Sequence, residues 1–249
     1  MMTDSSFSPF LVADIGGTNA RFGLVTGLDR ISERFSIGNQ KEFLCRDFDS
    51  IEAVLSSYLS GLPEMQLTSA CIAIAGPMTG DRVTMTNLNW SFSVESMRNR
   101  FGFDRLEVIN DFGAQAYATL YMDHGDLETL VPGIKQPTAN RLVIGPGTGL
   151  GVATLIRTGE RWHTVCGEGG HISYAPTSQF ETELRNTLDP SGAHVSVENL
   201  VSGPGLVSLY SALTQIKGVK AEFLTPAEIC GGALQDKDTT CSEAIALFC

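Results

Sequence analysis

The stretch LVADIGGTNARFGLV, residues 11–25, sets the organisation of this chain. An apolar run typical of a β-strand leads into two adjacent glycines and a second apolar run, so the sequence predicts a tight hairpin. Because Gly16 and Gly17 carry no side chain, an anion can approach the backbone N–H groups of the turn closely. The Thr18 hydroxyl and the Asn19 amide add donors beside them. The turn therefore fits a phosphate-binding site, although an ordinary glycine-rich hairpin shares the pattern.

Asp14 stands at the end of the first predicted strand. A free charge there would be costly if the strand is buried, so we expect the carboxylate to contact local donors or a metal-bound water.

A second stretch, RLVIGPGTGLGVATLI at residues 141–156, repeats the pattern of strand, Gly-Thr turn and strand. Gly147 and Thr148 correspond to Gly17 and Thr18, and Gly149 follows them. Two such hairpins predict two related halves. The simplest function for them is to bind the phosphates of one nucleotide from both sides of a cleft, whose closure would exclude water from phosphoryl transfer.

Several other nucleotide-binding motifs are absent from both stretches. Neither contains G-x-x-x-x-G-K-S/T, which excludes a P-loop. Neither contains G-x-G-x-x-G, because Leu150 and Val152 interrupt it. Residues 111–113 (DFG) match the metal-binding tripeptide of protein kinases, but no H-R-D or V-A-I-K segment accompanies them, so we interpret the match as chance.

The bulk composition is typical of a globular protein. The chain has 249 residues, enough for one large or two small domains, and 43% of them are hydrophobic. A formal net charge of −11 argues against nucleic acid or an anionic membrane as the main partner. No long apolar run or secretory signal is present, which indicates the cytoplasm.

The six cysteines include no C-x-x-C pair and lie among apolar neighbours. We expect reduced core thiols. Cys166 and His171 are close in sequence, but without two further ligands they do not predict a zinc site.

The best candidate for a catalytic group is Asp111. A short predicted strand, residues 106–109, ends at Asn110 and Asp111, and a helical pattern follows. Ligands of α/β proteins gather at the carboxyl ends of strands, and a helix N-terminus there favours anions. The alternative is that Asp111 is a simple helix N-cap.

Candidate sugar-binding residues follow in two later segments. Glu168 and His171 lie on a turn with three glycines, residues 167–171, where a carboxylate and an imidazole suit vicinal hydroxyls. A turn with solvated polar residues is the alternative. Glu198 is a carboxylate in an apolar context. A polar loop holds Asn87, Asn89 and Trp90. One interpretation places these residues near a sugar, and the other is a turn with a core tryptophan.

The remaining patterns predict a frayed leader over residues 1–9 and a third strand near 30–37 that completes an antiparallel meander. They also predict a helix capped at Asp49 and ending at Gly61, a buried strand at 69–75 and a strand at 161–165. Residues 127–140 are expected to form a loop and domain junction. Helices are predicted from Gly203, from Pro226 and from a capping box at Thr240, with Ile245, Ala246 and Phe248 on the apolar face of the last.

The final helix reaches Cys249 after barely two turns, without the glycine or basic residue that usually closes such an element. This pattern predicts a truncated chain.

Taken in order, five motifs closely resemble those of the bacterial-type glucokinases, in the sugar kinase, heat-shock protein and actin superfamily. They are DIGGTNAR (14–21), INDF (109–112), GPGTGLG (145–151), GEGGH (167–171) and ENLVSGPG (198–205). The resemblance implies an α/β, two-domain, actin-like ATPase (ribonuclease H-like) fold with a cleft between the domains. Residues 1–122 would form the small domain, and residues 123–249 would form the large domain, incomplete before its adenosine-binding segment.

The resemblance also implies ATP-dependent phosphorylation of D-glucose at the 6-hydroxyl, the first step of glycolysis. Asp111, with an ordinary carboxylate pKa of about 3.9, would take the hydroxyl proton. The sugar would be held by Asn110, Glu168, His171 and Glu198. ATP would be bound by Asp14, Gly16, Gly17, Thr18, Asn19, Gly147, Thr148 and Gly149, with Mg²⁺ bridging the phosphates and reaching Asp14 through water.

Family members are expected to be homodimers. They continue beyond this chain through a Gly-Gly segment that holds the adenosine and a terminal helix. Two alternatives therefore stay open: a kinase for another hexose such as fructose, mannose or an amino sugar, and a truncated sugar-binding fragment without activity.

Overall fold

The computed structural model of the chain describes residues 7–29, 34–76, 78–85, 88–123, 125–134, 136–235 and 238–249. It divides into two compact units. The first unit comprises Met1–Asn140 and Leu155–Thr164, and the second comprises Arg141–Thr154 and Val165–Cys249.

The first unit is built on a sheet whose order, over the described residues, is β3-β2-β1-β4-β8. The strands are β1 (Phe10–Ile15), β2 (Asn19–Asp29), β3 (Arg34–Leu44), β4 (Ser69–Ile74) and β8 (Arg105–Asn110). β1, β2 and β3 pair antiparallel, which confirms the predicted meander, while β4 is parallel to both β1 and β8. β3 runs on to Leu44, well past the predicted end at 37, because its pairing with β2 continues.

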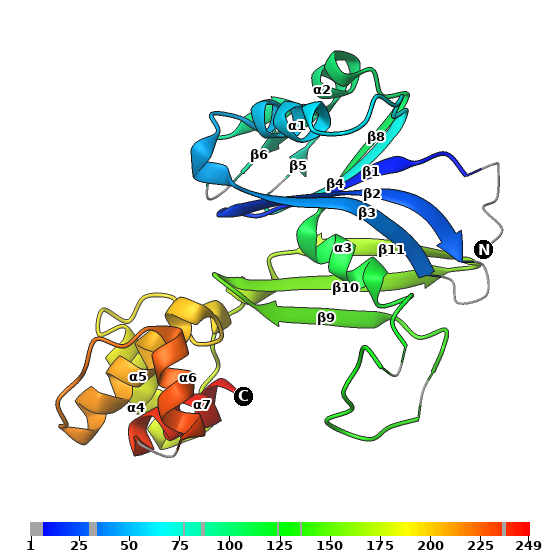
Figure 1. Cartoon of the computed structure of the whole chain (residues 1–249). Coiled ribbons are helices and arrows are strands. Elements are labelled where there is room, and N and C mark those ends of the chain that lie inside the picture. The colour runs from blue at the N-terminus through cyan, green and yellow to red at the C-terminus, as the bar shows by residue number, and fades with distance from the viewer. Residues whose placement is uncertain are drawn as a thin grey trace. The chain divides into compact units, whose positions relative to one another are not determined.

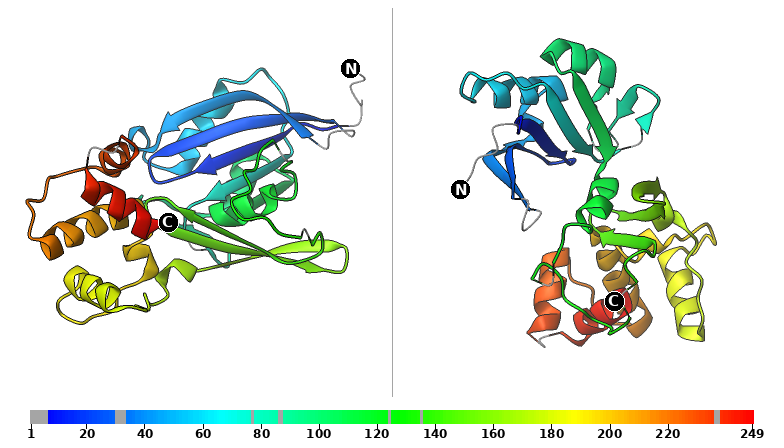
Figure 2. Two further views of the ribbon diagram at one scale, coloured as in Figure 1. Left: turned by 90° about the horizontal axis from the view of Figure 1, so that it is seen from below. Right: turned by 90° about the vertical axis from the view of Figure 1, so that its right-hand side faces the viewer.

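Helices cover both faces of this sheet (Figure 1). Figures 1 and 2 show α1 (Ile51–Ser60) and α2 (Val94–Phe101) on one face and α3 (Asp111–Ala118) on the other. α1 buries Ile51, Val54, Leu55 and Tyr58, spaced as the helical pattern predicts. Its N-cap is Ser50, whose side chain accepts from Ala53 N, so the predicted cap at Asp49 is one residue early.

A smaller sheet of the described residues has the order β5-β6-β7, formed by β5 (Met78–Thr79), β6 (Arg82–Thr84) and β7 (Ser91–Ser93). The loop between β6 and β7 brings Trp90 into the hydrophobic core of the first unit, where it is 5% exposed. Of the two alternatives for Trp90, a residue near a sugar or a core tryptophan, the structure shows the core tryptophan. Asn89 is exposed, and Asn87 lies outside the described residues.

The glycine-rich stretch at 141–156 forms the predicted hairpin. β10 (Leu150–Thr158) lies between β9 (Arg141–Pro146) and β11 (Arg161–Gly167), and the division into units passes through β10 and β11. No helix or strand is assigned to the described residues between Ala118 and Arg141, in agreement with the predicted loop at 127–140.

The regular structure of the second unit is mainly helical. Its helices are α4 (Gln179–Leu188), α5 (Gly203–Lys217), α6 (Pro226–Leu234) and α7 (Thr239–Phe248), with 3-10 turns η2 (Gly169–His171) and η3 (Val197–Asn199) before α4 and α5. The predicted helix from Gly203 is α5, which packs against α4, α6 and α7 and buries Leu206, Leu209, Tyr210 and Leu213. In Figure 2 these helices run from yellow (α4) to red (α7).

The last helix differs from its prediction. Asp238, not Thr240, is the N-cap of α7, since its carboxylate accepts from the backbone N–H groups of Thr240 and Cys241. The start therefore moves back by two residues, and the buried face becomes Thr240, Cys241 and Ala244. Of the predicted apolar face, Ile245 and Phe248 are half-buried and pack against the core of the second unit, whereas Ala246 is exposed.

The cysteine prediction is right in part. Cys45 and Cys241 are buried and Cys71 and Cys230 are half-buried, whereas Cys166 and Cys249 are exposed rather than in a core. Within the residues that the structure describes, no helix is both long enough and apolar enough to cross a membrane.

Candidate functional site

Three parallel strands of the first unit end at the same level of the sheet. Ile15 of β1 pairs with Ile74 of β4, and Ile74 pairs with Asn110 of β8. The turn after β1 and the start of α3 after β8 therefore share the carboxyl edge of the sheet, where α/β proteins bind ligands. This register brings together two motifs that lie almost a hundred residues apart in sequence.

The first glycine turn is tightly closed. Gly16 N–H donates to the carbonyl of Asn19 at 2.9 Å, and the main chain of Cys45 donates to the carbonyl of Thr18 at 2.8 Å. The thiol of Cys45 also lies 3.5 Å from the carbonyl of Gly16. Cys45 therefore contacts the carbonyls of both Gly16 and Thr18. Gly17 is half-buried, and the Thr18 side chain is exposed. This arrangement leaves the hydroxyl of Thr18 accessible to a ligand.

Asp14 is more exposed than the sequence suggested. Its side chain is 56% exposed and Oδ2 lies 3.5 Å from a guanidinium nitrogen of Arg21, its cross-strand partner. Arg21 also reaches Glu42 at 3.4 Å. Arg21 is thus a local donor of the kind expected for Asp14, although this residue is exposed while its neighbours in β1 are buried or half-buried.

Asn110 and Asp111 have different roles at the start of α3. Asn110 is the N-cap, because its Oδ1 accepts from Gly113 N–H at 3.1 Å, so the alternative that Asp111 is the cap is wrong. Asp111 is the first helical residue and is half-buried, and its Oδ1 accepts from Phe112 N–H at 2.8 Å.

The environment of Asp111 changes its acidity. Burial raises the pKa of the carboxyl above the ordinary value, and the nearby charge of Asp14 raises it further, against hydrogen bonds from Phe112 and Asn110 that lower it. The expectation of an ordinary pKa is therefore wrong, and Asp111 is a stronger base than an exposed aspartate.

The second glycine turn has its own closure. Gly147 N–H donates to the carbonyl of Gly149 at 2.7 Å, and the carbonyl of Gly147 accepts from Gly203 N–H at 2.8 Å. Gly147 and Thr148 are exposed, while Gly149 is half-buried. The first residue of α5 thus fixes this turn, which remains open toward solvent at Thr148.

The three other candidate residues of the second unit form one cluster. His171 lies between two carboxylates: Nδ1 is 3.7 Å from Glu168 Oε2, and Nε2 is 3.3 Å from Glu198 Oε1. Glu168 and His171 are exposed, as predicted for their turn, and the Glu198 side chain is 29% exposed. Two carboxylates and an imidazole suit several hydroxyls of one small polyol.

The carboxylates near the glycine turns determine whether the chain could hold Mg²⁺. Among the described residues, no group of three or more His, Cys, Asp or Glu side chains is arranged to hold a metal ion. Mg²⁺ bound with a nucleotide usually takes only one or two carboxylates, with phosphates and waters as its other ligands. The exposed Asp14, charged and close to Asp111, fits such a partial ligand set.

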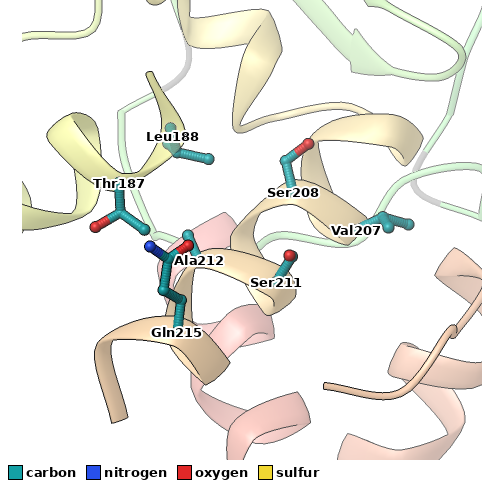
Figure 3. Close-up of a pocket in the computed structure, with 7 residues that line it drawn as sticks. All are labelled: Thr187, Leu188, Val207, Ser208, Ser211, Ala212 and Gln215. Carbon is teal, nitrogen blue, oxygen red and sulfur yellow. The ribbon is translucent and has the colours of Figure 1, made fainter. Parts of the chain in front are cut away.

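Two cavities of the second unit do not contain these residues. One of about 340 Å³ lies between α4 and α5 (Figure 3), lined by Thr187, Leu188, Val207, Ser208, Ser211, Ala212 and Gln215. The other, of about 430 Å³, lies between α5 and the segment before α6. Since neither has a charged cluster or glycine turn at its wall, we do not assign the site to them.

Sequence reasoning missed the residues that support the two turns. Arg21 could have been found, because it stands opposite Asp14 in a two-strand register. No sequence signal linked Cys45 or Gly203 to these turns, since the turn carbonyls that they contact are distant in sequence. The hydrogen bond from Leu150 N–H to Glu198 was missed for the same reason.

The sequence profile of the glucokinase family matches residues 11–249. A glucokinase of Saccharophagus degradans is 42% identical over 241 residues, which cover 97% of this chain and 74% of that protein. The crystal structure of a glucokinase from an Antarctic psychrotroph superposes with a TM-score of 0.87 at 40% identity, covering 98% of this chain and 76% of the other.

A ROK family glucokinase from Streptomyces griseus, in complex with glucose and AMPPNP, has a TM-score of 0.59 at 20% identity, with 97% of this chain and 75% of that chain covered. At that identity the likeness concerns the fold. Together these likenesses confirm the predicted α/β, actin-like ATPase fold class.

Proposed function

Because this chain belongs to the glucokinase family, we propose that it phosphorylates glucose with ATP, and that the 6-hydroxyl of the sugar is the acceptor. The observation that carries the proposal is the shared sheet edge of the first unit. There a half-buried aspartate with a raised pKa begins α3, in register with the end of the strand that leads into a glycine turn.

In the proposed mechanism, Asp111 orients the 6-hydroxyl and accepts its proton as the oxygen attacks the γ-phosphorus. A raised pKa suits this role, since a base is most effective when its pKa approaches the working pH. Asn110, Glu168, His171 and Glu198 bind the other hydroxyls of the sugar. A site made of such hydrogen bonds discriminates strongly against analogues that lack one of the hydroxyls.

The phosphates of ATP are bound by the two glycine turns, through Gly16, Gly17, Thr18 and Asn19 and through Gly147, Thr148 and Gly149. Asp14 is the residue that would hold Mg²⁺, through water. When bound, Mg²⁺ supplies charge neutralisation at the β- and γ-phosphates.

The first test is a sugar panel with ATP, containing glucose, fructose, mannose and an amino sugar, with detection of the sugar phosphate. Formation of glucose 6-phosphate with the highest kcat/KM supports the proposal. Calorimetry with glucose and with ATP accompanies it. Preference for another hexose, or no binding of glucose, would overturn the proposed substrate.

Asp111→Asn is the sharpest variant, because it keeps the side-chain shape and an oxygen for Phe112 N–H but cannot accept the proton. We expect turnover to fall about 100-fold or more, with glucose binding largely retained. Asp104→Asn is the matched control, since Asp104 is exposed and directly precedes the opposite end of β8. Wild-type turnover in Asp111→Asn would remove Asp111 from the proposed role.

We further propose that the reaction takes place in the cytoplasm, and that the protein acts as a homodimer without nucleic acid or membrane as partner. These points follow from the family resemblance and the acidic composition. Light scattering of the purified protein tests the oligomeric state.

A further inference from the structure

Glu198 contacts two candidate elements at once. Its Oε2 accepts from the backbone N–H of Leu150, the residue that follows the second glycine turn, at 2.7 Å. Its Oε1 lies 3.3 Å from Nε2 of His171, on the turn assigned to the sugar. One carboxylate thus joins the end of the phosphate turn to the sugar turn.

The packing around Glu198 depends on glycines. A Cβ on Gly149 would lie 2.5 Å from Glu198 Oε2, and a Cβ on Gly170 would lie 2.3 Å from the carbonyl oxygen of Leu150. Both distances are shorter than any ordinary Cβ contact. The two turns and the carboxylate therefore approach one another as closely as bare backbone allows.

The segment that carries Glu198 is itself firmly fixed. In η3, the Ser196 and Asn199 side chains form a capping box, and the carbonyl of Glu198 accepts from the buried Ser202 hydroxyl at 2.8 Å. Gly203, just beyond, donates to the carbonyl of Gly147 at 2.8 Å. The carboxylate is thus presented to Leu150 from a rigid base.

From these contacts we propose that Glu198 is a positioning residue for the second phosphate turn, acting through the Leu150 amide, and that it couples sugar occupancy to the conformation of residues 147–150. This inference deepens the proposed function and rests on it for the identity of the sugar. A ligand that contacts His171 or Glu198 changes the group that holds Leu150, so the turn responds to the sugar without touching it.

The test is residue-level amide hydrogen exchange of the whole chain, with and without glucose. Without any ligand, Glu198→Ala should accelerate exchange at Leu150 about tenfold or more, because an amide loses a charged hydrogen-bond acceptor. Glu198→Gln should restore most of the protection, since its amide oxygen can still accept from Leu150 N–H. The exposed Glu183→Gln on α4 is the control and should leave Leu150 unchanged.

Gly149→Ala provides an independent variant. The added methyl group must displace the carboxylate, which ends a flexible, partly exposed side chain, so the fold should persist while Leu150 loses its acceptor. We expect fast exchange at Leu150 in this variant too, and little further change in the double variant with Glu198→Ala. Unchanged exchange at Leu150 in either Glu198→Ala or Gly149→Ala would overturn the positioning role.

The glucose arm separates this inference from the proposed function. In wild type, glucose should change exchange at Leu150, and in Glu198→Ala it should not, even at saturation measured by calorimetry. Glucose that binds wild type without changing Leu150 overturns the coupling. Glucose that does not bind at all counts against the proposed substrate, while the ligand-free comparison still decides whether Glu198 positions the turn.

Discussion

At the scale of single residues, two aspartates of the first unit determine the acidity of the candidate base. Asp111 is half-buried at the start of α3, and Asp14 is exposed on β1 and paired with Arg21. The charge of Asp14 is one of the causes that raise the pKa of Asp111, after burial. One aspartate therefore keeps the other basic, while its own exposure leaves it available to a ligand.

This pairing predicts the effect of Asp14→Asn on acidity. A base acts only when deprotonated, so activity that depends on Asp111 falls as the pH decreases through its pKa. Removing the charge of Asp14 should lower that pKa, and the acid limb of kcat/KM should move to lower pH. NMR titration of the Asp111 carboxyl carbon measures the same shift without turnover.

The control is Glu107→Gln, because Glu107 is an exposed residue of β8 whose carboxylate pairs with Arg105 at 3.1 Å. It should leave the titration of Asp111 unchanged. If the midpoint in Asp14→Asn equals that of wild type, the charge of Asp14 does not act on Asp111.

At the scale of elements, the start of α5 supports both the core and the site of the second unit. The buried Ser202 accepts from Gly205 N–H at 2.9 Å and donates to the carbonyl of Glu198 at 2.8 Å. It therefore caps the central helix and holds the segment of Glu198. Pro204 lies in the first turn of the helix, where a missing N–H costs nothing.

Ser202→Ala should lower the free energy of unfolding by about 1–2 kcal/mol, because the helix loses its cap and a buried carbonyl loses its donor. Urea unfolding measures the change. Ser208→Ala on the exposed side of the same helix should stay within about 0.5 kcal/mol of wild type. Equal effects of the two substitutions would contradict the assigned cap.

The elements also show which sequence signals were sufficient. α5 was predicted because apolar spacing is a local signal, and α6 was predicted because a proline at the first helical position is another. α2 gave no such signal, since only Met97 of this polar helix is buried, and its start depends on Ser93 and on Asp81, which accepts from Glu95 N–H at 2.8 Å. β3 was predicted too short because most of its side chains are exposed and only its pairing with β2 defines it.

At the scale of the whole molecule, the described residues form a separate hydrophobic core in each unit. One core includes Ile72 and Trp90 of the first unit, and the other is centred on Leu209 of α5. Both tryptophans of the chain, Trp90 and Trp162, belong to the first unit, whereas α4–α7 of the second unit carry most of the helical residues. Tryptophan fluorescence therefore reports on the first unit, and far-UV circular dichroism reports mainly on the second.

Leu209→Ala should destabilise the second unit by about 2–5 kcal/mol, as is typical of a fully buried leucine. In urea, the far-UV circular dichroism transition should move to lower concentration more than the tryptophan fluorescence transition does. Ile72→Ala, in the other core, should show the reverse. If each variant shifts both transitions equally, the chain unfolds as one cooperative unit.

The predictability of the site differs between its residues. The glycine turns and Asp111 were found from sequence because short motifs carry their chemistry. The pKa of Asp111 was not, since burial and the neighbouring charge of Asp14 arise only when β1, β4 and β8 align. Likewise, no local pattern links Glu198 to Leu150, which lie 48 residues apart.

Because Cys45 contacts the first glycine turn, the reactivity of its thiol depends on the conformation of that turn. Burial raises the pKa of this thiol, which also lies against the Gly16 carbonyl, so alkylating reagents reach a reactive thiolate only when the segment opens. The alkylation rate of one cysteine therefore measures how often the turn opens. Mass spectrometry of the alkylated Cys45 can therefore follow ligand binding at the turn in crude mixtures, with no chromophore and no product assay.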